Sequence, residues 1–234
     1  MSMSLPIGPD VTDPSPTVPP GSGSLEGETV CLRPVVPVDD LEALYTASHG
    51  DSATEALWTY MPYGPFAARD AMGRWLEECA RAADPAFRVV VDRASGTPVG
   101  MVSYLNIVPA HRRLELGHIW YSPRVQRTRT NTEAMYLMLR EGLDRLGYRR
   151  IEWKCDALNA RSRAAALRLG FAFEGVFRQH MIVKGRNRDT AWFALVDRDW
   201  PTVRANMERW LYGDGPQTSL AALNEPVVRA GTGS

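Results

Sequence analysis

Apolar residues recur at regular spacings through the middle of the chain and lose that regularity toward both ends. In the first half, their spacing predicts a strand, two helices and then a three-stranded antiparallel meander. These elements are a strand over Thr29–Val36, a helix capped by Asp39, a helix from about Ala67 to Ala82, and meander strands over Phe87–Val91, Val99–Leu105 and Leu114–Tyr121. Turns at residues 92–97 and 109–113 separate the meander strands.

The second half alternates strands and helices and ends in a hairpin and a helix. Thr132–Leu146 is strongly amphipathic, and Gly147 closes it. The further elements are a strand over Arg150–Cys155, a helix from Asn159 to Leu169, a hairpin of Phe171–Phe177 and Thr190–Val196 around Lys184–Asp189, and a last helix from about Asp199 to Leu211. This order predicts one α/β domain built on a mixed sheet.

The two ends of the chain are weakly patterned. Pro, Gly and Ser follow one another closely in residues 1–24, which have too little apolar surface to offset the entropy of ordering. We therefore expect a disordered N-terminal arm. Residues 213–234 are expected to form a flexible C-terminal tail, although Leu220, Leu223 and Val227 offer apolar side chains that could dock. The folded domain is predicted over residues 25–212.

Composition and charge exclude several classes of protein. Of the 234 residues, 44% are hydrophobic and 23% are charged, as in an average soluble globular protein. The 27 basic and 27 acidic residues balance, so a broad basic surface for nucleic acid is not expected. No apolar run approaches the roughly 18 residues of a membrane helix. Cys31, Cys79 and Cys155 are odd in number and widely spaced, so we expect no disulfide framework, no metal site and a reducing cytoplasm.

The junction between the strand Leu114–Tyr121 and the long helix after it is rich in groups that bind anions. The first turn of a helix has unpaired N–H groups and a partial positive charge, which together favour a phosphate or pyrophosphate. Two guanidinium groups and three hydroxyl groups reinforce that end: Arg127, Arg129, Thr128, Thr130 and Thr132. The alternative is an ordinary capped loop with solvated arginines, and the residues alone leave both interpretations open.

A second strand-to-helix junction lies between Cys155 and Ser162. Asn159 can cap the helix and Ser162 can bond back to the backbone, which is a purely structural interpretation. Two such junctions at one edge of a sheet would instead line a shared cleft.

The same residues carry a resemblance to a known family. Its motifs are Leu116-Gly117-His118-Ile119-Trp120-Tyr121-Ser122-Pro123, Gln126, Thr132-Glu133-Ala134, Asn159-Ala160-Arg161-Ser162, Leu169-Gly170-Phe171 and Glu174-Gly175. Together with the order of elements, they make the chain from about Leu25 to Leu211 similar to the GNAT acyltransferase superfamily, and specifically to its RimJ/RimL-type N-acetyltransferase branch. The resemblance implies a mostly antiparallel sheet with one parallel pair that splays, acetyl-CoA as acyl donor, an amine acceptor and, by analogy, a homodimer.

By this resemblance, the pyrophosphate of acetyl-CoA lies on Gln126, Arg127, Thr128, Arg129, Thr130, Asn131 and Thr132. The pantetheine arm lies between the strand ends, against backbone near Trp120 and Tyr121 and the side chain of Asn159. The loop departs from the family in having no glycine. Either it follows a shallower path, with Arg127 and Arg129 gripping the phosphates, or it binds the donor weakly. We expect the shallower path.

The acetylated amine must be neutral, and roughly one-tenth to one-sixth of an α-amine is neutral at pH 7, so a mild base suffices. Glu115 is the candidate, because strict alternation places it on the same face of its strand as Ile119 and Tyr121. The alternative is that Glu115 pairs with Arg112 or Arg113. A bulge in the strand would also reverse its facing.

The remaining catalytic candidates follow from residue type and from the resemblance. His118 and His180 are weaker base candidates, because a lone histidine beside a strand is more often structural. By the resemblance, Ser162 protonates the departing sulfur.

The acceptor side is predicted from residues 57–64 and the hairpin Lys184–Asp189. Aromatic and proline side chains in residues 57–64 suggest a flat apolar wall, although simple core packing explains them equally well. Three functions compete. They are acetylation of a protein or peptide N-terminus, acetylation of a small-molecule amine, and acyl-CoA binding without turnover.

Overall fold

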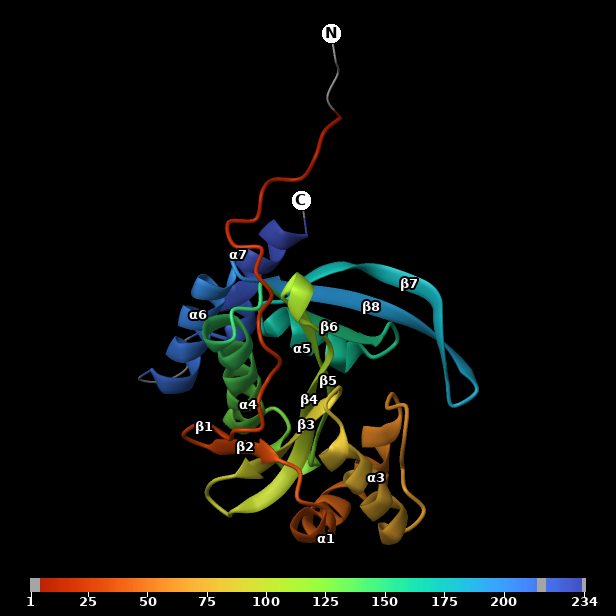
Figure 1. Ribbon diagram of the computed structural model, residues 1–234. Coiled ribbons are helices and arrows are strands. Elements are labelled where there is room, and N and C mark those ends of the chain that lie inside the picture. Colours follow the sequence, from red (N-terminus) through yellow and green to blue (C-terminus); the bar gives the residue numbers. More distant parts are fainter. Residues whose placement is uncertain (1–4, 214–217, 233–234) are drawn as a thin grey trace.

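Residues 5–213 and 218–232 are described by the computed structural model, in which one eight-stranded sheet runs through the molecule (Figure 1). The expectations for residues 1–4, 214–217 and 233–234 lie outside the described residues. The strands are β1 (Leu25–Glu26), β2 (Val30–Pro34), β3 (Ala86–Asp92), β4 (Thr97–Val108), β5 (Arg113–Tyr121), β6 (Arg150–Asp156), β7 (Ala172–Val183) and β8 (Arg186–Val196). Their order is β1-β2-β3-β4-β5-β6-β8-β7, and every neighbouring pair is antiparallel except β5 with β6. The predicted α/β domain with a mostly antiparallel mixed sheet is confirmed.

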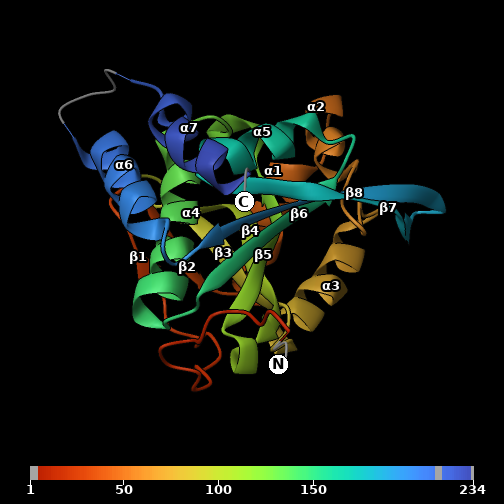
Figure 2. The same ribbon diagram turned by 90° about the horizontal axis from the view of Figure 1, so that it is seen from above.

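Helices cover both faces of the sheet, and each face has its own apolar core (Figure 2). The helices are α1 (Pro37–Ser48), α2 (Ser52–Glu55), α3 (Arg69–Arg81), α4 (Arg129–Arg140), α5 (Ala160–Arg168), α6 (Trp200–Tyr212) and α7 (Leu220–Gly231). One core contains Met135 of α4 and Met207 of α6. The other contains Leu44 of α1, Leu76 of α3 and Trp58. The sheet is therefore buried on both sides in its central part.

The first helix and the last hairpin differ locally from the predictions. α1 begins at Pro37 rather than at the predicted cap Asp39, because proline fits the first turn of a helix. β7 and β8 extend further than predicted and meet at Lys184 and Gly185, whose φ values are 50° and 74°. Positive φ at both residues is typical of a tight two-residue hairpin turn. The expected loop is therefore strand from Arg186 onward.

The C-terminal segment differs from the expected flexible tail, because residues 220–231 form α7. Ser219 caps this helix, and Leu220 is fully buried against the core. Asn224 is also buried and donates from Nδ2 to the carbonyl of Arg168 at 3.0 Å. The apolar side chains at positions 220, 223 and 227 recur at helical spacing, which gives the segment one face to bury. α7 thereby holds the end of α5 in place.

The expected N-terminal arm also touches the domain. Residues 5–24 form neither helix nor strand. The guanidinium of Arg88 donates to the carbonyls of Gly21 and Gly23, and Thr17 N donates to the carbonyl of Pro109 at 3.2 Å. This segment is therefore held by hydrogen bonds to its backbone groups rather than by apolar burial.

The one parallel pair of the sheet opens toward its carboxyl end. Paired residues of β5 and β6 end at Leu116 with Trp153, although β5 continues to Tyr121 and β6 to Asp156. The predicted splay of these strands is confirmed. Beyond Leu116, the edge of β5 that faces β6 has no strand partner, so the fold leaves a gap lined by polar backbone.

Candidate active site

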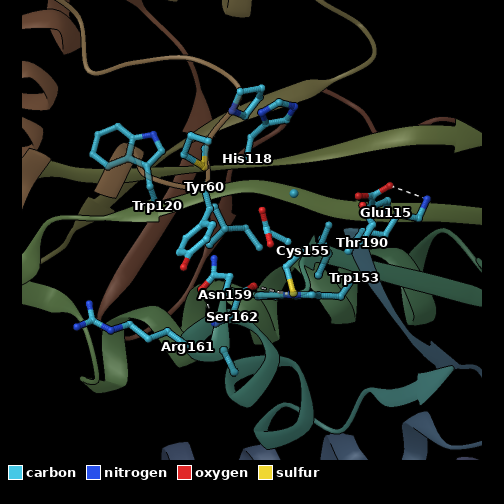
Figure 3. A pocket seen from close by; sticks show the side chains of 18 of the residues that line it. Tyr60, Glu115, His118, Trp120, Trp153, Cys155, Asn159, Arg161, Ser162 and Thr190 are labelled. Carbon is cyan, nitrogen blue, oxygen red and sulfur yellow. Dashed lines mark hydrogen bonds and ion pairs between the residues drawn. The ribbon is translucent and has the colours of Figure 1, made fainter. Parts of the chain in front are cut away.

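A cavity of about 1240 Å³ opens where β5 and β6 part (Figure 3). It passes between the strands, so residues from both faces of the sheet line it. On the face covered by α4 and α5, which we call the helix half, the lining includes Gln126, Asn131, Trp153, Cys155, Asn159, Ser162 and Arg168. On the opposite face, which we call the hairpin half, it includes Tyr60, Glu115, His118, Lys154, Arg188 and Trp192.

The helix half brings Asn159 and Ser162 against β6 (Figure 3). Asn159 Oδ1 accepts from Ser162 N at 3.1 Å, so Asn159 caps α5 as predicted. Ser162 Oγ accepts from Trp153 Nε1 at 3.0 Å, which leaves the hydroxyl hydrogen free to donate. Burial raises the pKa of the Cys155 thiol, and a hydrogen bond with Ser162 partly opposes that rise. The Ser162 hydroxyl therefore faces a sulfur atom at the cavity wall.

The amino end of α4 is open to a ligand. α4 begins at Arg129 rather than at the predicted Thr132, so Thr132 lies in its first turn. Among the described residues no side chain caps this end, and the Thr128 hydroxyl donates to the carbonyl of Val125 at 2.7 Å. Arg127 has a φ of 60°, the left-handed conformation that glycine favours. The expected shallower path is therefore not found at Arg127, which carries a strain of about 1–2 kcal/mol.

The structure brings part of the predicted anion loop to the cavity. Gln126 and Asn131 line it, Thr130 and Thr132 are buried, and Arg127, Thr128 and Arg129 are exposed outside the lining. Gln126 Nε2 donates to the carbonyl of Tyr121 at 3.0 Å, which ties the loop to the end of β5. Arg129 Nη2 lies 3.9 Å from Glu28 Oε2. The two loop arginines therefore lie on the surface, in the same segment as the lining residues Gln126 and Asn131 but outside the lining.

Sequence reasoning missed a buried arginine at this end of the helix half. Arg168, the last residue of α5, lines the cavity and donates from Nη2 to Thr132 Oγ1 at 2.9 Å. Burial lowers the pKa of its guanidinium. No carboxylate of residues 5–213 or 218–232 lies within 4.0 Å of it. Arg168 thus adds positive charge beside the first turn of α4. Its place in the last turn of a helix was visible in the sequence, but its burial was not.

Glu115 and Glu152 share one ammonium group in the hairpin half. Lys154 Nζ lies 2.9 Å from Glu115 Oε2 and 2.8 Å from Glu152 Oε2. Asn106 Nδ2 donates to the same Glu115 oxygen at 2.7 Å. The ammonium also lies 3.9 Å from the centre of the Trp192 ring. Glu115 is therefore paired with a cation, as the alternative interpretation held, but the cation is Lys154 rather than an arginine.

A bulge in β5 reverses the facing of its last residues. The pairing with β4 shifts register between Gly117 and Trp120, and His118 in that interval has a φ of 51°. Tyr121 consequently packs in the core under α4, whereas Glu115 lies in the hairpin half. The prediction that Glu115 and Tyr121 share a face is wrong, because strict alternation fails at the extra residue of a bulge.

Both candidate histidines line the hairpin half. Burial lowers the pKa of His118 to about 4, so its imidazole is neutral at pH 7. Its Nδ1 lies 3.0 Å from the Tyr63 hydroxyl. His180 Nδ1 lies 3.0 Å from Thr190 Oγ1. Each histidine is thus tied to a neighbouring hydroxyl, and Glu115 remains the base candidate of this half.

Buried polar atoms without partners gather around this cavity. In the described part of the chain, all five buried side-chain nitrogen and oxygen atoms without a hydrogen-bond partner belong to lining residues: Trp120 Nε1, Tyr121 Oη, Glu152 Oε2, Arg188 Nε and Trp192 Nε1. Only the Glu152 oxygen among them has a counter-ion beside it. Each such group costs roughly 1–3 kcal/mol when left unpaired. Their concentration here indicates a site that a polar ligand completes.

The tip of the hairpin β7–β8 reaches the segment before α3 (Figure 1). Lys184 Nζ donates to the carbonyls of Trp58 at 2.8 Å and Gly64 at 2.5 Å. The Tyr60 hydroxyl donates to the carbonyl of Leu158 at 3.3 Å. The two segments predicted to form the acceptor side are therefore neighbours in space.

Three general features of the chain are also visible. In residues 5–213 and 218–232, no helix is both long and apolar enough to cross a membrane. The same residues contain no group of three or more His, Cys, Asp or Glu side chains arranged to hold a metal ion. Cys31, Cys79 and Cys155 are free.

Known proteins share this fold and this sequence pattern. A family model described as an acetyltransferase (GNAT) domain matches residues 29–172. The chain is similar to the structure of a GCN5-related N-acetyltransferase from Brucella melitensis, with 37% identity, a TM-score of 0.86, and coverage of 90% of this chain and 98% of that one. It is also similar to a structure from Chromobacterium violaceum ATCC 12472 described as a probable acetyltransferase of the GNAT family. The identity there is 39%, the TM-score 0.78, and the coverage 86% of this chain and 100% of that one.

A comparison by sequence alone gives a weaker match to a curated protein. Over 105 residues the chain is 28% identical to the "Putative ribosomal N-acetyltransferase YdaF" of Bacillus subtilis (strain 168). The matched residues are 45% of this chain and 57% of that protein. The family model, by contrast, covers more than half of this chain, and the parted strands and the cavity agree with it. The chain belongs to the GNAT family of acetyltransferases, in agreement with its resemblance to the RimJ/RimL-type branch.

Proposed function

We propose that the protein is an acetyl-CoA-dependent N-acetyltransferase that acts on a primary amine, with protein or peptide N-termini as acceptors. Transfer occurs by direct attack of the amine in a ternary complex. One observation supports this above all others: a cavity passes between the parted ends of β5 and β6, and buried polar atoms without partners lie on both faces of it. A long ligand threaded through this gap reaches the hairpin half with one end and α4 with the other.

The helix half fits acetyl-CoA. Backbone groups of β5 beyond Leu116 face the gap and can bond to the amides of a pantetheine arm. The first turn of α4 and the guanidinium of Arg168 offer positive charge to a diphosphate. Arg127 and Arg129 are exposed beside the lining residues Gln126 and Asn131, where they can reach phosphates that project from the cavity. When bound, acetyl-CoA supplies the acetyl group as an activated thioester.

The hairpin half then supplies the base for proton transfer, and the helix half supplies the acid. The carboxylate of Glu115 takes a proton from the amine, directly or through a water molecule. The Ser162 hydroxyl, which accepts from Trp153 Nε1, gives a proton to the departing sulfur and regains one from water. Backbone N–H groups near Trp120 and Tyr121 stabilise negative charge on the carbonyl oxygen. The acid and the base therefore lie on opposite faces of the sheet, with the reacting groups between them.

An α-amine suits this arrangement better than a lysine side chain does. Its pKa of about 7.7–8.0 leaves a useful neutral fraction at pH 7, so a carboxylate that is already paired with Lys154 suffices as base. The segment 57–64 and the hairpin tip offer a wall for the residues that follow the amine. We take residues 25–212 together with α7 as the catalytic unit. A homodimer and a cytoplasmic location remain predictions from the sequence.

Thiol release from acetyl-CoA tests the function directly. The purified protein is offered ribosomal-protein N-terminal peptides, small primary amines and no acceptor, and free CoA thiol is measured. We expect release that depends on peptides with a free α-amine, and mass spectrometry should locate the acetyl group on that amine. Release with small amines alone would establish the second function. Tight acetyl-CoA binding without release on any amine would establish the non-catalytic one.

Glu115→Gln is expected to lower kcat/KM about 10- to 100-fold, because it removes the base but keeps the shape of the side chain. Lys154 retains Glu152 as its counter-ion in this variant. The readout is kcat/KM at one fixed pH, measured with the same α-amine peptide for the variant and the unaltered enzyme. His118→Asn is the control, since asparagine tolerates the left-handed backbone found there, and it should keep most of kcat/KM. A Glu115→Gln enzyme with undiminished kcat/KM would exclude Glu115 as the base.

A further inference from the structure

Arg188 lies in the hairpin half with a positive charge that no described acid neutralises. Its Nε is buried without a hydrogen-bond partner among the described residues. No carboxylate of residues 5–213 or 218–232 lies within 4.0 Å of its guanidinium. The adjacent acid is turned elsewhere, because Asp189 Oδ1 accepts from Gln179 N at 2.7 Å. Asp156, on the neighbouring strand, accepts at Oδ1 from Leu158 N at 2.8 Å.

The acids further along the cavity wall are already paired. Glu115 and Glu152 both contact Lys154. Arg188 is therefore a lining cation of this half for which no described residue supplies a counter-ion. A partly buried guanidinium without a counter-ion is costly, and a bound anion relieves that cost.

Arg188 also lies close to the place of reaction. It alternates on β8 with Thr190 and Trp192, and all three line the cavity. Trp192 Nε1 is a second buried donor without a partner on the same strand. The positive charge of Arg188 also partly opposes the rise that burial causes in the pKa of the Cys155 thiol, and Cys155 and Ser162 line the same cavity. An anion held by Arg188 would therefore lie in the cavity where the amine reacts.

We infer that Arg188 binds a carboxylate of the acceptor, a few bonds from the amine that is acetylated. This inference rests on the proposed N-acetyltransferase function. The planar guanidinium matches a carboxylate with two parallel hydrogen bonds, and the Trp192 indole offers a third donor. The carboxylate has two sources. One is the side chain of an N-terminal Asp or Glu, and the other is the free α-carboxylate of a small amino acid.

Matched acceptor pairs test the inference. The first pair is the peptide amides Glu-Ala-Ala and Gln-Ala-Ala, and the second is alanine with alaninamide. Every kcat/KM is expressed per concentration of neutral amine, because the carboxylate of alanine raises the pKa of its own amine. We expect the unaltered enzyme to prefer the carboxylate member of one pair by about 10- to 100-fold in kcat/KM, chiefly through KM, as befits hydrogen bonds to a charged group. The pair that shows the preference identifies the source of the carboxylate.

Variants assign that preference to Arg188. In Arg188→Gln the ratio of carboxylate to amide rates should fall to about one. In Arg188→Lys part of it should remain, because lysine keeps the charge but not the fork. Arg186→Gln, an exposed arginine outside the cavity lining, is the control and should keep the full ratio. Circular dichroism shows whether each variant is folded. If a variant does not fold, the comparison of acceptor pairs in the unaltered enzyme still tests whether a carboxylate is recognised.

Two results would overturn the inference and leave the proposed function standing. One is equal kcat/KM for both members of each pair in the unaltered enzyme. The other is a preference that Arg188→Gln retains in full. Thiol release from none of the acceptors would instead overturn the proposed function, and the inference with it.

Discussion

Replacing Ser162 with alanine is expected to lower kcat about 100-fold, the contribution typical of a positioned general acid. The reason is geometric. Ser162 Oγ accepts from Trp153 Nε1 at 3.0 Å, so the hydroxyl does not spend its hydrogen on the indole and can donate it at the cavity wall. The hydroxyl is held by α5, which Asn159 caps independently of the Ser162 side chain. Alanine therefore removes the proton donor without altering the helix. Single-turnover thiol release measures the chemical step.

The Ser162→Ala enzyme should bind acetyl-CoA with an affinity close to that of the unaltered protein, which separates a catalytic role from a binding role. Trp153→Phe is the matched control. It removes the indole N–H but leaves the hydroxyl, so we expect a smaller loss of kcat. Undiminished turnover by Ser162→Ala would exclude Ser162 from the mechanism. An equal loss of affinity and turnover would assign it to donor binding instead.

Arg168→Met is expected to raise the Kd for acetyl-CoA about 10- to 100-fold, which corresponds to the loss of hydrogen bonds to a charged group. Arg168 is a cation of the helix half without a described counter-ion, and it lies beside the first turn of α4. Methionine keeps most of the volume and the contact with apolar neighbours. Isothermal titration gives the Kd for acetyl-CoA and for pantetheine, which has no phosphate. The comparison shows whether the loss of affinity depends on the phosphates.

The double variant Arg127→Ala with Arg129→Ala provides the comparison. Both side chains are exposed, so we expect a smaller loss of affinity than for Arg168→Met, and one that fades at high salt. Unchanged affinity in the double variant would exclude Arg127 and Arg129 as phosphate ligands. Unchanged affinity in Arg168→Met would exclude Arg168. The two measurements therefore show whether the phosphates bind to the exposed Arg127 and Arg129 or to the buried Arg168.

Local periodicity predicted most elements correctly, and it failed where a single residue interrupts it. The bulge at His118 reverses the end of β5, so alternation placed Glu115 and Tyr121 on one face when they lie on opposite faces. The two-residue turn at Lys184 was missed because a lysine with positive φ is uncommon, and its ammonium is held by carbonyls of the distant residues Trp58 and Gly64. Contacts of this kind have no local signature.

The candidate site was predicted only in part, because contacts between distant segments leave no mark in the local sequence. Asn159 and Ser162 lie at a strand-to-helix junction, and their spacing places both in one helical turn whatever surrounds them. Lys154, Arg168 and Arg188 were not selected, because nothing in their immediate sequence shows that they are buried or short of counter-ions. Those properties arise only when β5, β6, β8 and α5 come together.

The sequence by itself determined the order of helices and strands, the mixed sheet, and the two junctions that hold the loop 126–132 and the Asn159–Ser162 turn. These follow from spacing and capping, which act over a few residues. Only the tertiary structure decided which charges meet: Lys154 between two carboxylates, Arg168 beside α4, and Arg188 without an acid. Electrostatic pairing and burial depend on distances between segments remote in the chain, so they follow from packing rather than from local pattern.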